Sequence, residues 1–129
     1  MRLYFMEKKR KGKINDILNY NIKDSEIYDI ECIEKAKGLM TSIQKDYYMH
    51  NDVSIILQGK VIDIKNGNNN IEITIRGKRF DSIVFCEFNK DSNLINIDKE
   101  QFIKIKGYLK LNDKFIRDSF IKLKDCKLV

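Results

Sequence analysis

The spacing of hydrophobic residues changes along the chain, from three or four residues before about residue 50 to two residues after it. The segment DSEIYDIECIEKAKGLMTSIQKDYY, at residues 24–48, carries the longer spacing and predicts an amphipathic helix. Asp24 or Ser25 is its predicted N-cap, and Gly38 is a point at which the helix can divide. The apolar stripe consists of Ile27, Ile30, Ile33, Ala36, Met40, Ile43 and Tyr47.

A shorter helix is predicted before this segment, within INDILNYNI at residues 14–22. Its apolar positions are Ile14, Ile17, Leu18 and Ile22.

After Asp52, short runs rich in Ile, Val and Phe alternate with polar residues, which predicts β-strands separated by turns. In the first run the apolar residues lie on one face up to Val61 and on the other face from Ile62. A shift of one residue reverses the face of every later side chain, so we expect a bend or bulge near Gly59. The sequence NGNNN, at residues 66–70, predicts a hairpin turn because Asn and Gly tolerate positive φ.

Four further strands are predicted in IEITIR, SIVFCEF, QFIKIKGYLKL and SFIKLKDCKLV. Between the second and third of these, NKDSNLINID is long enough to hold a helical turn or a short helix. Five strands with a break after the third are typical of an OB-fold barrel. The predicted fold is therefore mainly β with an α N-terminal part: a helical extension over residues 1–50 and an OB-fold domain over residues 51–129.

Composition fits one soluble globular unit, because 129 residues with 43% hydrophobic and 34% charged residues support a single core. The N-terminus lacks a signal-peptide pattern, and no run reaches the roughly 18 apolar residues that span a bilayer. A cytoplasmic protein without a membrane span is therefore expected. The formal charge of +6 can mark a polyanion binder, although Lys, Asn and Ile are also the residues of AT-rich codons.

Catalytic and cofactor chemistry have little support. The three cysteines, Cys32, Cys86 and Cys126, form no CxxC pair, and His50 is the single histidine and lies in a polar connector. A Walker loop, a Ser-His-Asp arrangement and a carboxylate cluster at metal spacing are not found in the sequence. We expect buried free thiols, no metal site, no cofactor and no enzymatic activity.

Four short motifs resemble the small bacterial OB-fold proteins called tRNA-anticodon-binding-like. The motifs are LQGKVIDI, SIVFCEF, IKIKGYL and IKLKDCKLV, and together they cover about residues 53–129. The residues that carry the resemblance are Gly59, Val61, Val84, Cys86, Phe88, Gly107, Leu123, Cys126 and Leu128. The resemblance implies a barrel related to nucleic-acid binders, with Val84, Cys86 and Phe88 pointing inward. Members often sit beside membranes or outside the cell, and the lack of a leader segment here departs from them.

OB folds bind ligands on the face of strands two and three, between the loops that join strands one to two and four to five. If the inward assignment holds, Phe85 points outward beside Arg76, with Lys78, Arg79 and Phe80 in the adjoining turn. Such a face supplies an aromatic ring for stacking and cations for phosphates. The alternative is that Phe85 packs under the N-terminal helix and that RGKR is a solvated hairpin tip.

Two other basic features have both a binding and a structural interpretation. Lys104, Lys106 and Lys110 surround Tyr108 on one strand face, where lysines either follow a phosphate backbone or protect the sheet edge. The arm EKKRKGK, at residues 7–13, either meets an anionic partner or is simply solvated.

The sequence therefore favours a non-enzymatic OB-fold module that contacts single-stranded DNA or RNA, without evident base specificity. The main alternative is a protein-interaction or assembly module in which barrel and helix form an oligomeric interface. A binder of small molecules or oligosaccharides is a third possibility.

Overall fold

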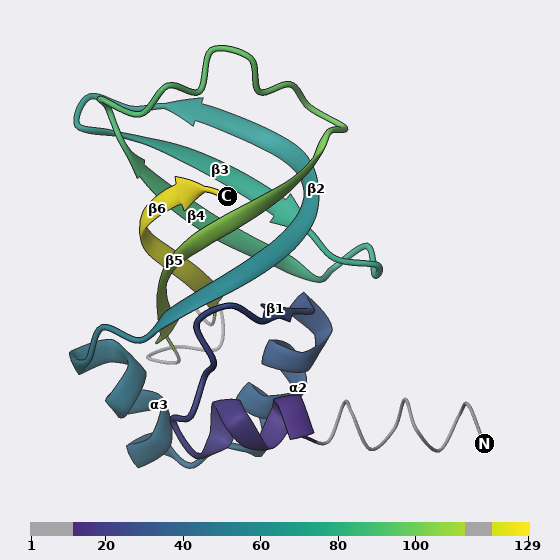
Figure 1. The fold of residues 1–129 in the computed structure, drawn as a ribbon, viewed down its shortest axis with the longest axis vertical. Helices are drawn as coiled ribbons and strands as arrows, with labels where there is room; N and C mark the ends of the chain where they lie inside the picture. The colour runs from purple at the N-terminus through teal and green to yellow at the C-terminus, as the bar shows by residue number, and fades with distance from the viewer. Residues whose placement is uncertain (1–11, 113–119) are drawn as a thin grey trace.

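The computed structural model describes residues 12–112 and 120–129, and their strands close into a barrel with helices packed at one end (Figure 1). The barrel strands are β2 (Ser54–Asn66), β3 (Asn70–Arg76), β4 (Ile83–Asn89), β5 (Phe102–Asn112) and β6 (Phe120–Leu128).

Strand order around the barrel is β2-β3-β4-β6-β5, and pairing between β5 and β2 closes it. All neighbours are antiparallel except β4 and β6, which run parallel. A five-stranded closed barrel of this kind is an OB-fold, so the predicted fold class is confirmed.

The predicted irregularity in the first barrel strand is also confirmed. Register between β2 and β3 shifts between Val61 and Asp63, which is a β-bulge. A Cβ on Gly59 would lie 2.8 Å from the carbonyl oxygen of Arg76, so glycine permits the close approach of β3 at this point. After the bulge, Ile64 continues the inward face and packs against the core.

The turn at residues 66–70 joins β2 to β3 as predicted, and the Gly67 amide donates to the Asn70 carbonyl over 3.0 Å. The predicted use of positive φ in this turn was wrong, because none of the residues 66–70 has a positive φ. Among the described residues, positive φ occurs at Tyr20, Glu100 and Asp125 instead. The segment between β4 and β5 folds into turns rather than a short helix.

The N-terminal part contains a helical segment at residues 12–18, a short strand β1 (Ile27–Tyr28), and the helices α2 (Ile30–Leu39) and α3 (Ser42–His50). The shorter helix is confirmed, with Ile14 and Ile17 buried. The predicted start of the long helix at Asp24 was wrong, whereas its possible division near Gly38 is confirmed. His50, expected in a connector, is the last residue of α3.

The long helix starts late because β1 takes the first residues of the apolar stripe. Ile27 and Tyr28 pair with Ile56 and Leu57 of β2, which also pair with β5. A strand has two edges, so β1 occupies the edge that β3 uses further along β2. Tyr28 is fully buried there, and α2 begins only after Asp29.

The division between α2 and α3 comes from a capping box. Met40 is extended and ends α2, as expected for a break close to Gly38. The side chain of Thr41 then accepts from the Gln44 amide, while the Gln44 side chain accepts from the Thr41 amide. This T-x-x-Q pattern is visible in the sequence and marks the start of α3.

One hydrophobic core joins the helices to the barrel. Residues from both parts are fully buried, and the Tyr48 hydroxyl of α3 donates to the Ile17 carbonyl inside the helical part. The proposed division into domains at residue 50 stays a prediction. In the described ranges, no helix combines the length and hydrophobicity needed to cross a bilayer.

Cys32, Cys86 and Cys126 are buried and form no disulfide bond, as predicted. Burial raises the pKa of Cys86 well above its usual value, and contact with Cys126 adds to the shift. We therefore expect native protein to react with a thiol reagent at Cys86 and Cys126 far more slowly than unfolded protein. Mass spectrometry of labelled peptides checks this, and equally fast native labelling at both sites would contradict the inward orientation of β4.

Candidate nucleic-acid interface

The outward residues of β4 form the centre of the candidate face. Val84, Cys86 and Phe88 are buried in the barrel, so the alternating residues point outward, as the inward assignment required. Phe85 is paired with Thr74 of β3 and is half-buried.

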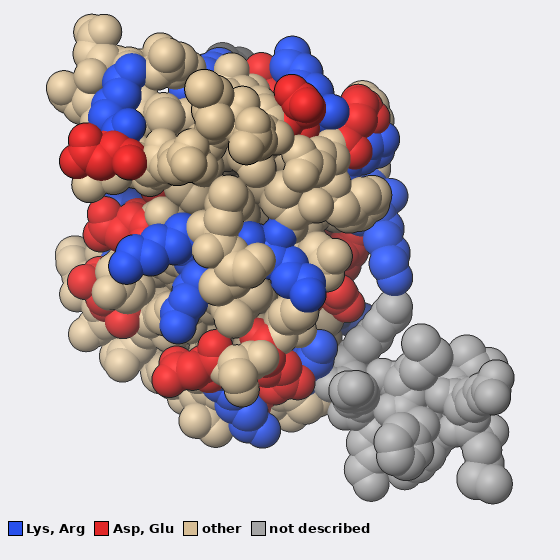
Figure 2. Space-filling view, turned by 45° about the horizontal axis from the view of Figure 1, so that its top comes forward, with Lys and Arg blue, Asp and Glu red and all other residues tan. Residues whose placement is uncertain are grey.

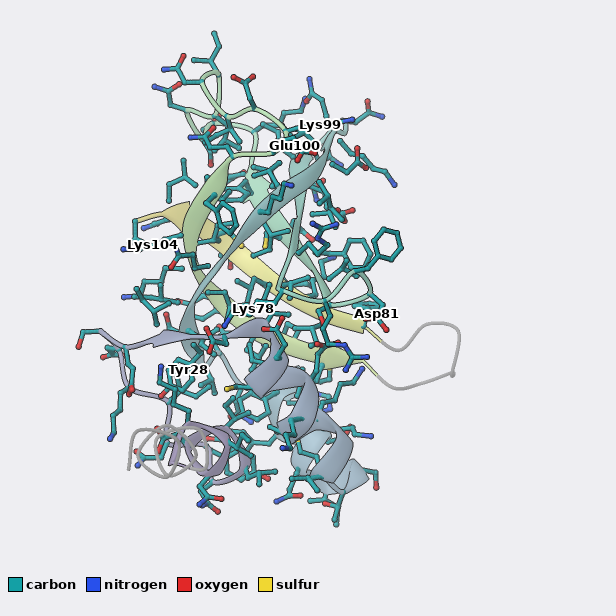
Figure 3. The ribbon with its side chains drawn as sticks, turned by 90° about the vertical axis from the view of Figure 1, so that its right-hand side faces the viewer. Tyr28, Lys78, Asp81, Lys99, Glu100 and Lys104 are labelled. Atoms are coloured by element: carbon teal, nitrogen blue, oxygen red, sulfur yellow. The ribbon has the colours of Figure 1, made fainter. Side chains whose placement is uncertain are left out.

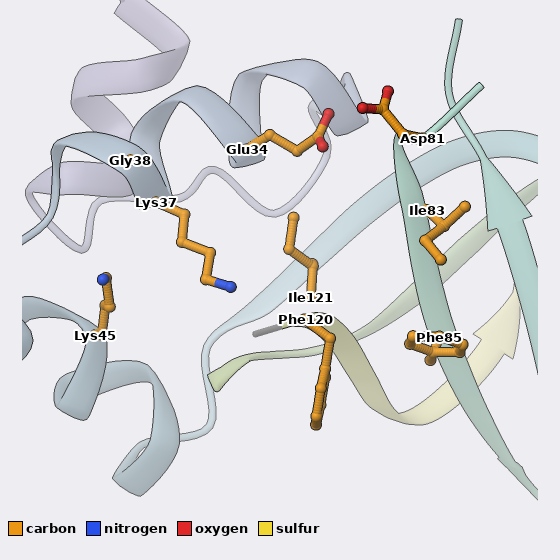
Figure 4. A pocket seen from close by; sticks show the side chains of 9 residues that line it. All are labelled: Glu34, Lys37, Gly38, Lys45, Asp81, Ile83, Phe85, Phe120 and Ile121. Carbon is orange, nitrogen blue, oxygen red and sulfur yellow. The ribbon is translucent and has the colours of Figure 1, made fainter. Parts of the chain in front are cut away.

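Phe85 lies beside an aromatic partner that the sequence did not indicate. Its ring packs edge-to-face against Phe120 of β6, with centroids 6.1 Å apart. The two rings line a groove of about 360 Å³, across which the helices form the opposite wall (Figure 4). The lining residues are Glu34, Lys37, Gly38, Lys45, Asp81, Ile83, Phe85, Phe120 and Ile121.

A second groove continues from the first along the outside of the barrel. It has a volume of about 240 Å³ and shares Phe85 and Phe120 with the first groove. Glu72 and Lys122 complete its lining. The helices pack mainly against β2 and β5. Residues of α2 and α3 also line the first groove, so Phe85 faces a groove between the barrel and the helices.

Arg76 and Phe80 form a cation–aromatic pair at the edge of this face. The Arg76 guanidinium carbon lies 6.0 Å from the centroid of the Phe80 ring, which is 87% exposed. Arg76 Nε is buried and has no hydrogen-bond partner within residues 12–112 and 120–129. A donor buried without an acceptor costs free energy.

Lys78 and Arg79 lie in the turn between β3 and β4, which is tied to α2. Their backbone amides both donate to Oε1 of Glu31, over 3.4 Å in the case of Arg79. A Cβ on Gly77 would lie 2.5 Å from the same oxygen, so glycine permits this approach. The Arg79 side chain is exposed and lies 3.6 Å from Asp81. The base of the turn is thus fixed while its cationic side chains reach solvent.

The predicted lysine row on β5 lies apart from β3 and β4, because β5 pairs only with β2 and β6. Lys104 is exposed, and Lys106 and Tyr108 are half-buried. Lys110 was expected outward in solvent but is only 8% exposed. Its ammonium donates to the Asn51 carbonyl over 3.0 Å and to Asp52 over 3.1 Å, at the end of α3.

The two ends of the outer face differ in charge. Toward the 66–70 turn, Glu72 and Glu87 stand directly opposite each other on β3 and β4. Lys122 lies 2.7 Å from Glu87, and this hydrogen bond lowers the pKa of Glu87. Arg76 lies toward the other end of β3, beside Lys60 of β2. Figure 2 shows charges of both signs mixed over the surface, with basic side chains gathering across the middle of the face in view.

Sequence reasoning missed three residues near this face: Lys60, Phe102 and Phe120. Phe102 and Phe120 begin β5 and β6, and their local sequence does not indicate which side chains of other strands lie beside them. Only the barrel register shows that Phe102 and Arg76 flank the same lysine.

Other candidate features add little to the site. Most of the basic arm at residues 7–13 lies outside the described residues, and Lys13 donates to the Ile27 carbonyl over 2.8 Å. In the parts of the chain that the structure describes, no group of three or more His, Cys, Asp or Glu residues is arranged to hold a metal ion.

Comparison with solved structures supports the fold. A protein from Klebsiella pneumoniae subsp. pneumoniae, named as a "putative nucleic acid-binding lipoprotein", superposes with a TM-score of 0.65 at 15% identity, covering 81% of this chain and 91% of its own. The OBody AM3L09, in complex with hen egg-white lysozyme, gives a TM-score of 0.49 at 9% identity, covering 66% and 91%. A replication protein A heterotrimer bound to single-stranded DNA gives 0.41 at 14% identity, covering 59% and 57%.

No protein-family model matches the chain, and a search of curated proteins finds no relative. The barrel topology and the similarity to the Klebsiella structure establish the OB-fold, while membership of the tRNA-anticodon-binding-like family stays a prediction.

We expect Glu31→Ala to loosen the turn between β3 and β4, because two backbone amides lose their acceptor. Amide hydrogen exchange at Lys78 and Arg79 should accelerate, and stability should fall by about 1 kcal/mol. Glu34→Ala, also on α2, is the matched control. Unchanged exchange at both amides would show that Glu31 does not fix the turn.

Proposed function

We propose that this protein is a non-enzymatic OB-fold module that binds single-stranded nucleic acid on the outer face of β3 and β4. The observation that carries the proposal is the open Phe85–Phe120 groove beside the Arg76–Phe80 pair. Aromatic faces stack on bases of any identity, and cations neutralise the phosphates between them.

Charge and fold support the same ligand class. The net charge of +6 favours association with a polyanion. The Klebsiella protein with the similar fold is named for nucleic-acid binding, and replication protein A was solved with single-stranded DNA. A bacterial origin, the family relationship and a cytoplasmic address are parts of this proposal and rest on the sequence pattern alone.

Neither face geometry nor charge favours one base over another. The cations reach solvent on flexible side chains, and a ring stacks on any base. We therefore propose binding without base specificity, to DNA or RNA.

One observation favours the rival function, a protein-interaction or assembly module. Several apolar side chains at the junction of α2 and α3 are exposed, including Leu39 at 63% and Ile43 at 79%. Exposed apolar patches mark protein interfaces when they are contiguous. Such an interface leaves the β3–β4 face free, and its association is insensitive to salt.

The test is fluorescence anisotropy with labelled single-stranded DNA and RNA over a range of salt concentrations. We expect Phe85→Ala to weaken binding by about 1–3 kcal/mol with an unchanged salt slope, because only stacking is lost. The double variant Arg76→Gln, Arg79→Gln should reduce the slope by about 1.4, at about 0.7 for each phosphate contact.

Controls separate these effects from a general loss of charge or fold. The variant Lys23→Gln also removes a charge, from an exposed position in the N-terminal part away from the face, and should keep the wild-type slope. If wild-type protein does not bind at low salt, while light scattering detects oligomers that Ile43→Ala disrupts, the assembly function is correct instead.

A further inference from the structure

The barrel register connects two basic features that are far apart in the sequence. Lys60 of β2 pairs with Arg76 of β3 on one edge and with Phe102 of β5 on the other. We call the cross-strand set Phe102, Lys60, Arg76 and Ile83 the Lys60 row. Its members point to the outside of the barrel, because the alternating residues Gly59, Val61, Ile75 and Val84 are buried.

Two exposed aromatic rings flank the cations of this row. Phe80 stands against the Arg76 guanidinium and is 87% exposed, and Phe102 is 68% exposed. Neighbouring strands lie about 4.8 Å apart, so the backbones at Phe102 and Arg76 are separated by about 10 Å. Lys104 lies on the same side of β5, about 7 Å beyond Phe102.

From this arrangement we infer that a bound single strand leaves the β3–β4 face sideways, crossing β2 at Lys60 to reach Phe102 and Lys104 on β5. This inference rests on the proposed function and adds the path that the bound strand takes over the barrel. The span of about 10 Å matches about three stacked nucleotides at 3.4 Å each. One base stacks near Phe80 and another on Phe102, with the phosphates between them beside Arg76 and Lys60.

Charge decides between this path and the one toward the 66–70 turn. Along the path toward the 66–70 turn, a bound strand meets the carboxylates of Glu72 and Glu87, which are paired across β3 and β4. The nearby lysines already have acidic neighbours, because Lys65 pairs with Glu72 and Lys122 forms an ion pair with Glu87. The Lys60 row and Lys104 supply three cations against one carboxylate, Glu100. A polyanion is therefore attracted along the row more strongly than toward the turn.

Glu100 is the competitor that a phosphate has to displace. Its carboxylate lies 2.5 Å from the Lys60 ammonium, and this contact lowers the pKa of Glu100, so it is ionised at neutral pH. Glu100 is 72% exposed and lies at the barrel end away from the helices (Figure 3), so its side chain can swing into solvent. Exposed ion pairs of this kind are weak and are exchanged readily for another anion.

The test uses fluorescein-labelled dT12 and anisotropy with the full chain. We expect Phe102→Ala and Phe102→Leu to weaken binding about 5- to 150-fold, since both lack the flat ring and the leucine keeps apolar bulk. Lys60→Gln should reduce the salt slope by about 0.7, and Glu100→Gln should tighten binding. Ile95→Ala, which removes another highly exposed apolar side chain, should bind like wild type.

The outcomes separate the path from the function itself. If wild-type protein binds and Phe85→Ala weakens binding, but Phe102→Leu and Lys60→Gln bind like wild type, the path is wrong and the proposed function stands. If wild-type protein does not bind dT12 or its RNA counterpart at low salt, the proposed function fails together with the path.

Discussion

At Lys60, β2 changes from pairing with β5 on one edge to pairing with β3 on the other edge. β2 pairs with β5 through residues 54–60 and with β3 through residues 60–66. A barrel of five strands closes only if a strand turns between its two partners, and the bulge between Val61 and Asp63 supplies that turn. The same corner sets Phe102, Lys60 and Arg76 side by side, so closure of the barrel and the layout of the outer face have one cause.

The helical part depends on this corner as well. Where β3 has ended, the free edge of β2 is taken by β1, which fixes the start of α2. Gly59 and Gly77 then let Ile30 and Glu31 of α2 approach the barrel closely, with a Cβ on Gly59 only 3.2 Å from Ile30 Cδ1. The helices are therefore held mainly against β2 and β5, and a groove lined by Phe85 and Phe120 remains between them and the barrel. An N-terminal helix need not block an OB-fold groove if an edge strand anchors it elsewhere.

Local pattern predicted the parts of this structure that local physics decides. The family resemblance, carried by short local motifs, implied that Cys86 and Phe88 point inside, and the change of apolar face at Val61 predicted the bulge. Pattern failed where a partner distant in sequence decides the outcome. Ile27 and Tyr28 fit a helical stripe but pair with β2, and Lys110 fits a solvent-facing row but bonds to Asn51 and Asp52. The site was predicted in part for the same reason: Arg76, Phe80 and Phe85 are close in sequence, whereas Lys60, Phe102 and Phe120 join them only through strand order.

The central claim is that the outer face centred on Arg76 and Phe85 binds single strands, and chemical-shift mapping tests it most directly. Titration of ¹⁵N-labelled protein with dT12 should shift the amides of β3, β4 and the 77–82 turn, with smaller changes near Lys60 and Phe102. The amides at the C-terminal end of α3, away from the groove residue Lys45, should stay in place. Shifts confined to α2 and α3, or shifts caused by protein concentration alone, would contradict the account and assign the interface to the helices.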